Sequence, residues 1–201
     1  MNVTTEELES PPLVSLPLFP LRTVLMPGGA LGLRIFETRY LDLVRDCARS
    51  ATGFGVCLLL DGEEVGAPAT PAEFGTEARI EDFDRTPDGL LALRVRGTRR
   101  FRVASTRTQA NGLVVGEVAW CDPDIDDELR PEHALLGIVL QRILDQAGGE
   151  HADAPKARFD EAAWVSWRLA EVLPLTDEQR AALLAIDDPH ARLQRLLAEM
   201  P

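Results

Sequence analysis

The chain changes character near residue 122, and this change constrains the fold more than any other feature. Residues 13–121 consist of short apolar runs broken by glycine and proline, a pattern typical of β-strands. Residues 131–201 carry apolar residues at helical spacing, which predicts helices. The segment between them is acidic and contains Pro123, as linkers often do. We therefore expect a flexible tail over 1–12, a β subdomain over 13–121, an acidic linker over 122–130 and a helical bundle over 131–201.

The first region predicts a series of short strands with one inserted helix. Hairpin turns are indicated by Pro87-Asp88-Gly89 and Asn111-Gly112, because glycine and asparagine tolerate positive φ. A further turn is expected at Gly97-Thr98. Apolar residues gather on one face of residues 38–50, which predicts a helix there. Strands are expected near residues 14–18, 30–35, 55–60, 76–84, 90–95, 101–108 and 113–120.

The second region contains start and stop signals for several helices. Pro131 suits a first helical position, and Gly148-Gly149 suits the end of that helix. A second helix is expected over 159–173. Thr176 with Gln179 forms a capping-box pattern for a third. Asp188 followed by Pro189 indicates the start of the last helix.

The charge balance excludes several classes of function. With 21 basic and 33 acidic residues the net charge is −12, which disfavours general binding to nucleic acids or anionic membranes. Lys156 is the single lysine, and it lies in Ala154-Pro155-Lys156-Ala157 rather than in a Walker A loop. No other lysine is present to form a Schiff base or a Ser–Lys dyad.

The cysteines and the amino-terminal residues favour a cytoplasmic protein. Cys47, Cys57 and Cys121 are odd in number and widely spaced, which indicates reduced thiols rather than a disulfide framework. Residues 1–10 contain three glutamates and no basic residue, unlike a signal peptide. No apolar run approaches the roughly 18–20 residues of a membrane span.

The histidines and serines give no catalytic or metal-binding pattern. His133, His151 and His190 have none of the i, i+4 spacings that place two ligands on one helix face. His133 and His190 fall in first turns of expected helices, where we expect exposure to solvent. No serine lies in a Gly-x-Ser-x-Gly motif. We therefore expect no catalytic residue, no metal and no cofactor.

A run of arginines is the strongest electrostatic feature of the chain. These residues alternate with apolar ones, so the arginines should share one exposed strand face. Two interpretations remain open. The arginines pair with acidic residues on neighbouring strands, or they form a surface that binds carboxylates, peptide backbone or nucleic acid. The residues of this basic strand face are Arg94, Arg96, Arg100 and Arg102.

The segment 16–37 is apolar but interrupted by three prolines and three glycines. Because proline removes a backbone donor, we expect short strands joined by rigid loops rather than one regular strand. Phe19, Leu21 and Met26 are unusual residues for loops unless they pack or bind. They either pack into the β subdomain or form an exposed apolar patch that binds other chains.

This segment and later parts of the chain contain a set of short motifs. They are Leu16-Pro17-Leu18-Phe19-Pro20-Leu21, Pro27-Gly28, Leu33-Arg34-Ile35-Phe36-Glu37, Arg39-Tyr40, Gly53-Phe54-Gly55-Val56, Gly75-Thr76, Arg100-Phe101-Arg102-Val103 and Leu173-Pro174-Leu175. Taken together, these motifs resemble the N-terminal substrate-binding domain of ATP-dependent Lon proteases, over about residues 13–198. Thr38 departs from the proline that the family often has there.

The resemblance implies an α+β fold, a PUA-like mixed β pseudo-barrel with one inserted helix, followed by a C-terminal helical bundle. It also implies a non-enzymatic module that binds a polypeptide, such as an unfolded segment, a degron or an adaptor, with a full-length Lon protease as a further candidate partner. The alternative is a small-molecule or RNA-binding PUA-like domain. Candidate polypeptide-binding residues are Phe19, Leu21, Met26, Phe36, Arg39 and Tyr40, although Phe36 and Tyr40 suit the core equally well.

Overall fold

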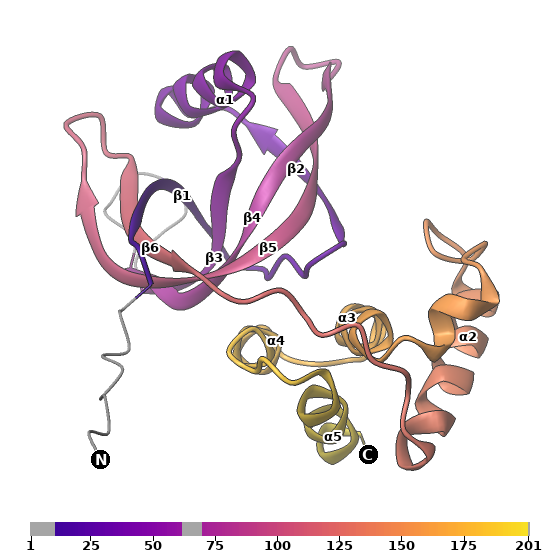
Figure 1. The fold of residues 1–201 in the computed structure, drawn as a ribbon. Helices are drawn as coiled ribbons and strands as arrows, with labels where there is room; N and C mark the ends of the chain where they lie inside the picture. Colours follow the sequence, from indigo (N-terminus) through magenta and orange to yellow (C-terminus); the bar gives the residue numbers. More distant parts are fainter. Residues whose placement is uncertain (1–10, 62–69, 201) are drawn as a thin grey trace, which may run out of the picture.

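The structure is a computed structural model that describes residues 11–61 and 70–200. Strands and one helix occupy the chain up to Trp120, and helices follow from Pro131 (Figure 1). The α+β fold that we expected is therefore confirmed, while most of the expected tail lies outside the described residues. The elements are β1 (Val14–Leu21), β2 (Ala30–Ile35), α1 (Thr38–Ser50), β3 (Phe54–Asp61), β4 (Thr70–Arg85), β5 (Leu91–Thr108), β6 (Val114–Trp120), two 3-10 helices (Pro131–His133 and Lys156–Asp160), α2 (Ala134–Ala147), α3 (Ala162–Val172), α4 (Asp177–Leu183) and α5 (Pro189–Glu199).

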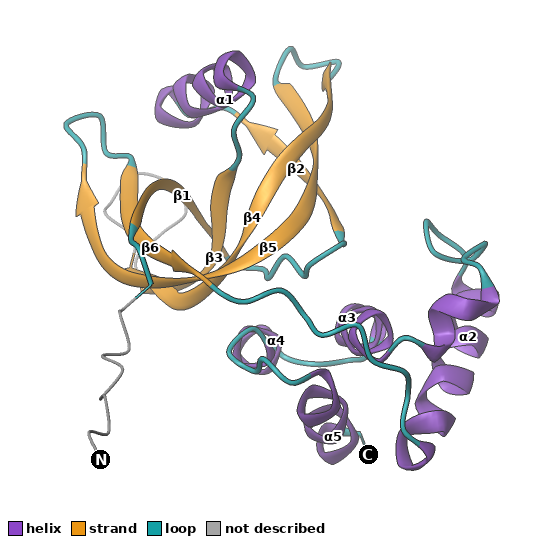
Figure 2. Cartoon of the chain, in the orientation of Figure 1, coloured by secondary structure: helices purple, strands orange, loops and turns teal. Residues whose placement is uncertain are grey.

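The strands form one sheet that closes on itself. Their order is β2-β5-β4-β3-β1-β6, and β5 also pairs with β6 (Figure 2). This second pairing joins β5, β4, β3, β1 and β6 into a barrel-like ring. Strand β2 lies outside the ring and pairs only with β5 among the strands that the structure describes. The outer edge of β2 is consequently left without a strand partner.

Strand β5 runs without interruption where we expected a turn at Gly97-Thr98, so that prediction is wrong. The N–H of Gly28 donates to the carbonyl of Gly97, and the N–H of Gly97 donates to the carbonyl of Gly29, each at 2.8 Å. A Cβ on Gly97 would lie 2.2 Å from the carbonyl oxygen of Met26. Glycine is needed at this position because the loop before β2 passes directly over β5.

Two prolines of the amino-terminal segment lie inside one strand, which runs beyond the expected end near residue 18 and includes Pro20, where we expected a loop. Strand β1 includes Pro17 and Pro20. Residues 14–17 pair antiparallel with β6, and residues 18–21 pair parallel with β3. Each half of β1 therefore has one edge outside these ladders, where a missing N–H costs no ladder hydrogen bond.

Three apolar clusters form the core, and buried arginines join the strands to the helices. One cluster lies between α1 and the barrel, one at the other end of the barrel and one among the helices. Arg100 of β5 donates to the carbonyl of Leu184 at 2.7 Å and pairs with Asp187 at 2.9 Å. Arg168 of α3 donates to the carbonyl of Pro27 at 2.5 Å. These contacts hold the barrel against the helices.

The helix signals agree with the structure except at two starts, because Pro131 begins a short 3-10 helix and α2 itself starts at Ala134. Thr176 and Gln179 form the expected capping box, and Asp188 caps α5. The helix expected over 159–173 begins only at Ala162, because a 3-10 helix occupies the residues before it.

Candidate functional site

An apolar groove lies between the end of β1 and strand β2. It encloses about 160 Å³. We call it the seam groove, because it runs beside β2, the strand that lies outside the ring. Its lining brings together four of the residues that the sequence singled out, from β1, from α1 and from the turn between β2 and α1. The lining residues are Phe19, Leu21, Gly32, Leu33, Arg34, Ile35, Phe36, Glu37 and Tyr40.

Aromatic side chains define the floor and the rim of the seam groove. Tyr40 lies in the first turn of α1 and its ring stacks on Phe19 of β1, with the centroids 3.8 Å apart. Both side chains are buried, so they form the floor. Phe36 is 56% exposed and stands at the rim. An apolar side chain of a bound polypeptide would therefore contact aromatic rings at both the floor and the rim of the groove.

Two strand edges without partners border the seam groove. Residues 18–21 of β1 pair on one side only, with β3. Strand β2 pairs on one side only, with β5, within the described part of the chain. The free side of such a strand presents backbone N–H and C=O groups that can pair with another extended chain.

Arg39 does not line the groove but holds residues that do. Its side chain is buried, its Nη1 donates to the carbonyl of Gly112 at 2.9 Å, and its Nε pairs with Glu37 at 3.0 Å. The guanidinium carbon lies 4.7 Å from the ring centroid of Tyr40. Arg39 thus fixes the start of α1 against the turn between β5 and β6.

The apolar patch that we considered is mostly covered. Phe19, Leu21 and Met26 are all buried, and Met26 packs into the cluster formed by the helices, away from the seam groove. Phe19 and Leu21 lie in β1 rather than in a loop, and their side chains are covered, as is that of Met26 in the loop before β2. Phe36 is the member of the candidate set that stays well exposed.

The four arginines of the basic strand face do not form one free surface. Arg94 and Arg96 both pair with Glu81, at 3.2 and 2.7 Å, and both also pair with Glu150. Hydrogen bonds from Arg96 lower the pKa of Glu81. Arg102 pairs with Glu73 of the neighbouring strand at 2.6 Å.

Arg100 differs from the other three arginines because its side chain is buried against the helices. The register between β4 and β5 shifts between Thr76 and Ala78, which is the signature of a β-bulge. The bulge breaks the strict alternation that we had assumed. These ion pairs leave little free positive charge for nucleic acid.

Two histidines that we expected in solvent are buried, so that expectation is wrong. His133 and His190 stack on each other, with their Nδ1 atoms 3.0 Å apart. The Nε2 of His190 contacts Asp127 at 3.2 Å. They lie inside because α5 and the first 3-10 helix pack together. Within residues 11–61 and 70–200, no three His, Cys, Asp or Glu side chains are placed to hold a metal ion.

Comparison with known proteins decides the family. The family model described as the ATP-dependent protease La (LON) substrate-binding domain matches residues 15–200. The chain belongs to this family. The resemblance read from the motifs is thereby confirmed, and the chain is a Lon-type substrate-binding domain.

Solved structures support the fold of this Lon-type domain. A crystal structure of a Lon N-terminal domain protein from Xanthomonas campestris is 60% identical, with a TM-score of 0.82, covering 94% of this chain and 99% of that one. The N-terminal domain of a Mycobacterium avium complex Lon protease is 18% identical, with a TM-score of 0.67, covering 92% and 97%. At that identity the second likeness shows the fold alone.

Curated relatives match a smaller region. Protein cereblon from Danio rerio is 32% identical over 103 residues, which is 49% of this chain. Protein cereblon from Xenopus tropicalis is 31% identical over 107 residues, which is 51% of this chain. The matched region spans 23% of the length of each cereblon. No helix in the described part of the chain is long and apolar enough to cross a membrane.

The sequence indicated the aromatic members of the seam groove but not their arrangement. Leu33 and Ile35 also line it, and their alternation along β2 was visible in the sequence. The groove itself depends on β1 and β2 lying near each other without pairing. No local pattern in the chain predicts that relationship.

Proposed function

We propose that this Lon-type domain binds polypeptides in the seam groove, as an extended segment added along the outer edge of β2. A ligand side chain of aliphatic type would enter between Phe36 and Tyr40. The observation that carries this proposal is the coincidence of an apolar groove with two strand edges that have no partner among the described strands. Membership of a substrate-binding domain family supports the same class of ligand.

The energetics of such a site favour weak binding. Burying one apolar side chain contributes about 1.5–3 kcal/mol. Each backbone hydrogen bond adds about 0.5–1.5 kcal/mol net. Ordering the peptide offsets part of this gain, which leaves micromolar or weaker affinity. Such affinity suits a module that recruits a chain and then releases it.

In the proposed role the domain binds a polypeptide and catalyses no reaction on it. Lys156 is the single lysine of these 201 residues, and the residues around it form neither a Walker A loop nor a Ser–Lys dyad. A full-length Lon protease is a candidate partner to which a bound polypeptide would be passed. Three free cysteines support a location in the reducing cytoplasm.

The test is fluorescence anisotropy with labelled β-casein, an unfolded protein, as the probe. Phe36→Asp should weaken binding about tenfold, which corresponds to about 1.4 kcal/mol. The matched control is Phe83→Asp, since Phe83 is 72% exposed and lies outside the groove. Equal binding by the two variants would remove the seam groove from the proposal.

A second probe separates the polypeptide proposal from the RNA alternative. Single-stranded RNA is titrated into the wild-type domain at low and high salt. We expect no binding of RNA at either salt concentration. Retention of RNA that falls steeply as salt rises would contradict a polypeptide-binding role and favour phosphate recognition.

A further inference from the structure

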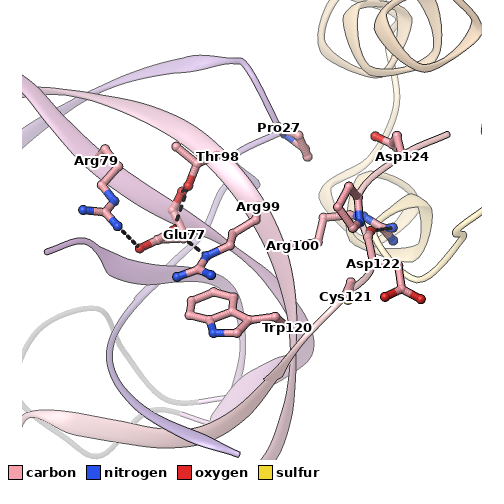
Figure 3. A pocket seen from close by; sticks show the side chains of 11 residues that line it. Pro27, Glu77, Arg79, Thr98, Arg99, Arg100, Trp120, Cys121, Asp122 and Asp124 are labelled. Carbon is pink, nitrogen blue, oxygen red and sulfur yellow. Dashed lines mark hydrogen bonds and ion pairs between the residues drawn. The ribbon is translucent and has the colours of Figure 1, made fainter. Parts of the chain in front are cut away.

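A second and larger pocket lies between the barrel and the segment that follows β6. It encloses about 730 Å³ and shares no lining residue with the seam groove. Side chains of β4, β5 and β6 form one wall, and residues 121–124 form the opposite wall, to which Arg100 of β5 also reaches (Figure 3). We call it the junction pocket, because it opens where the strands meet the helical part of the chain.

A buried carboxylate organises the strand wall of the junction pocket. Glu77 is 3% exposed and accepts hydrogen bonds from Thr98 at 2.9 Å and from Arg99 Nε at 3.0 Å. It also pairs with Arg79 Nη2 at 3.0 Å. Two guanidinium groups therefore share one carboxylate, and the cluster keeps one positive charge in excess.

The excess charge is presented by Arg99 rather than by Arg79. Arg79 is further engaged, since its Nη1 donates to the carbonyl of Ala51 at 2.7 Å. The guanidinium carbon of Arg99 lies 3.4 Å from the ring centroid of Trp120. Among the described residues, neither terminal nitrogen of Arg99 donates a hydrogen bond. The Arg99 side chain remains 51% exposed.

We propose that the junction pocket binds a carboxylate of a peptide through the two terminal nitrogens of Arg99. A guanidinium held flat on an indole and tied at Nε has lost most of its freedom before a ligand arrives. Its two terminal nitrogens have the spacing that a carboxylate accepts as a pair of parallel hydrogen bonds. This contact is separate from the seam groove and does not depend on it.

The charges around the pocket favour a singly charged ligand. One carboxylate neutralises the one excess positive charge of the Glu77 cluster. Asp122 and Asp124 line the opposite wall, and the charge of Arg100 beside them is paired with Asp187, so a doubly charged phosphate would meet more repulsion. Asp124 is itself paired with Arg192 at 2.7 Å, which limits its effect on a monoanion. The carboxylate can come from a chain terminus or from an acidic side chain.

Small peptides in ¹⁵N NMR titrations of the wild-type domain test the proposal. The probes are acetyl-Ala-Ala-Ala with a free carboxyl end, the same peptide as an amide, acetyl-Ala-Glu-Ala-amide, and inorganic phosphate. We expect the free-carboxylate and glutamate peptides to shift the Arg99 Nε and Trp120 indole signals, and their relative affinities identify the source of the carboxylate. Equal shifts with the fully amidated alanine peptide, or tighter binding of phosphate, would overturn the proposal.

Matched variants locate the contact. Arg99→Gln should weaken carboxylate binding about tenfold, and Arg99→Lys nearly as much, because lysine keeps the charge but loses the planar fork. Arg102→Gln is the control, since Arg102 is exposed on the same strand and pairs with Glu73. Phe36→Asp should leave this binding unchanged while it weakens β-casein binding. Undiminished binding by Arg99→Gln would refute the assignment.

Discussion

The rings of Phe19 and Tyr40 stack with their centroids 3.8 Å apart and their planes inclined by 18°. Phe19 belongs to β1 and Tyr40 to the first turn of α1, so this contact fixes the helix against the barrel. The same two rings form the floor of the seam groove, which Phe36 borders at the rim. Substitution of a floor residue should therefore change the free energy of unfolding more than substitution of the rim residue Phe36 does.

Phe19→Ala should lower the free energy of unfolding by about 3–5 kcal/mol, because it empties a buried site and removes the stack with Tyr40. Phe36→Ala should change it by less than about 0.5 kcal/mol, since that ring is mostly exposed. Urea unfolding of both variants measures the two values. A loss at Phe19 of under about 1 kcal/mol would show that its ring is not packed as described.

This contrast explains what the sequence could predict about the candidate site. The apolar, proline-rich composition of residues 16–37 identified the right segment. Composition cannot tell whether a loop side chain faces solvent or another part of the chain. Met26 illustrates the point, because its burial depends on helices more than a hundred residues away. Phe36 is much more exposed than Met26, so it remains the best probe of binding.

Local signals predicted the helices and most strands, and long-range contacts account for the errors. The helix α1 was predicted from its apolar face with the same bounds that the structure shows. Gly97 gave a false turn signal, because a glycine is needed there for another reason: the backbone of residues 26–29 passes close to it. Pro20 gave a false loop signal because β1 continues past residue 18 by changing its pairing partner. Both errors have causes that lie outside a window of neighbouring residues.

The close approach at Gly97 predicts an unusual response to alanine. Gly97→Ala should destabilise the domain by about 1–3 kcal/mol, because the added Cβ meets the carbonyl oxygen of Met26. Gly32→Ala is the matched control in β2, where nothing lies within 4 Å of an added Cβ. That variant should be neutral or stabilised by up to about 1 kcal/mol. Thermal and urea unfolding compare the two, and equal effects would contradict the described packing at Gly97.

The buried histidine pair should make stability depend on pH. Burial, with the facing His190, lowers the pKa of His133 below its usual value of 6.5. The groups around the pair are Asp127, Arg130, Glu132 and Asp188. From the lowered pKa up to about pH 6.5, the unfolded chain binds more protons at His133 than the folded chain does. Acidification through this window therefore lowers the free energy of unfolding.

His133→Asn isolates that contribution. Other groups also titrate, since burial lowers the pKa of His151 and raises the pKa of Glu171 to about 7. Both are present in the wild type and in the variant, so their contributions cancel in the comparison. Urea unfolding at pH 7 and pH 5 should show a smaller loss of stability in the variant. An equal or larger loss would mean that His133 does not resist protonation in the folded domain.

The three cysteines should react in an order set by their burial. Burial raises the pKa of the Cys57 and Cys47 thiols, and both side chains are buried. Cys121 is partly exposed and lines the junction pocket, although burial raises its pKa as well. Because the thiolate is the reacting form, iodoacetamide should label Cys121 first and the other two only when urea unfolds the domain. Peptide mapping by mass spectrometry measures the order, and early labelling of Cys57 would contradict its place in the barrel core.

A carboxylate peptide bound at Arg99 should slow labelling of Cys121 alone, since the two residues line the same pocket.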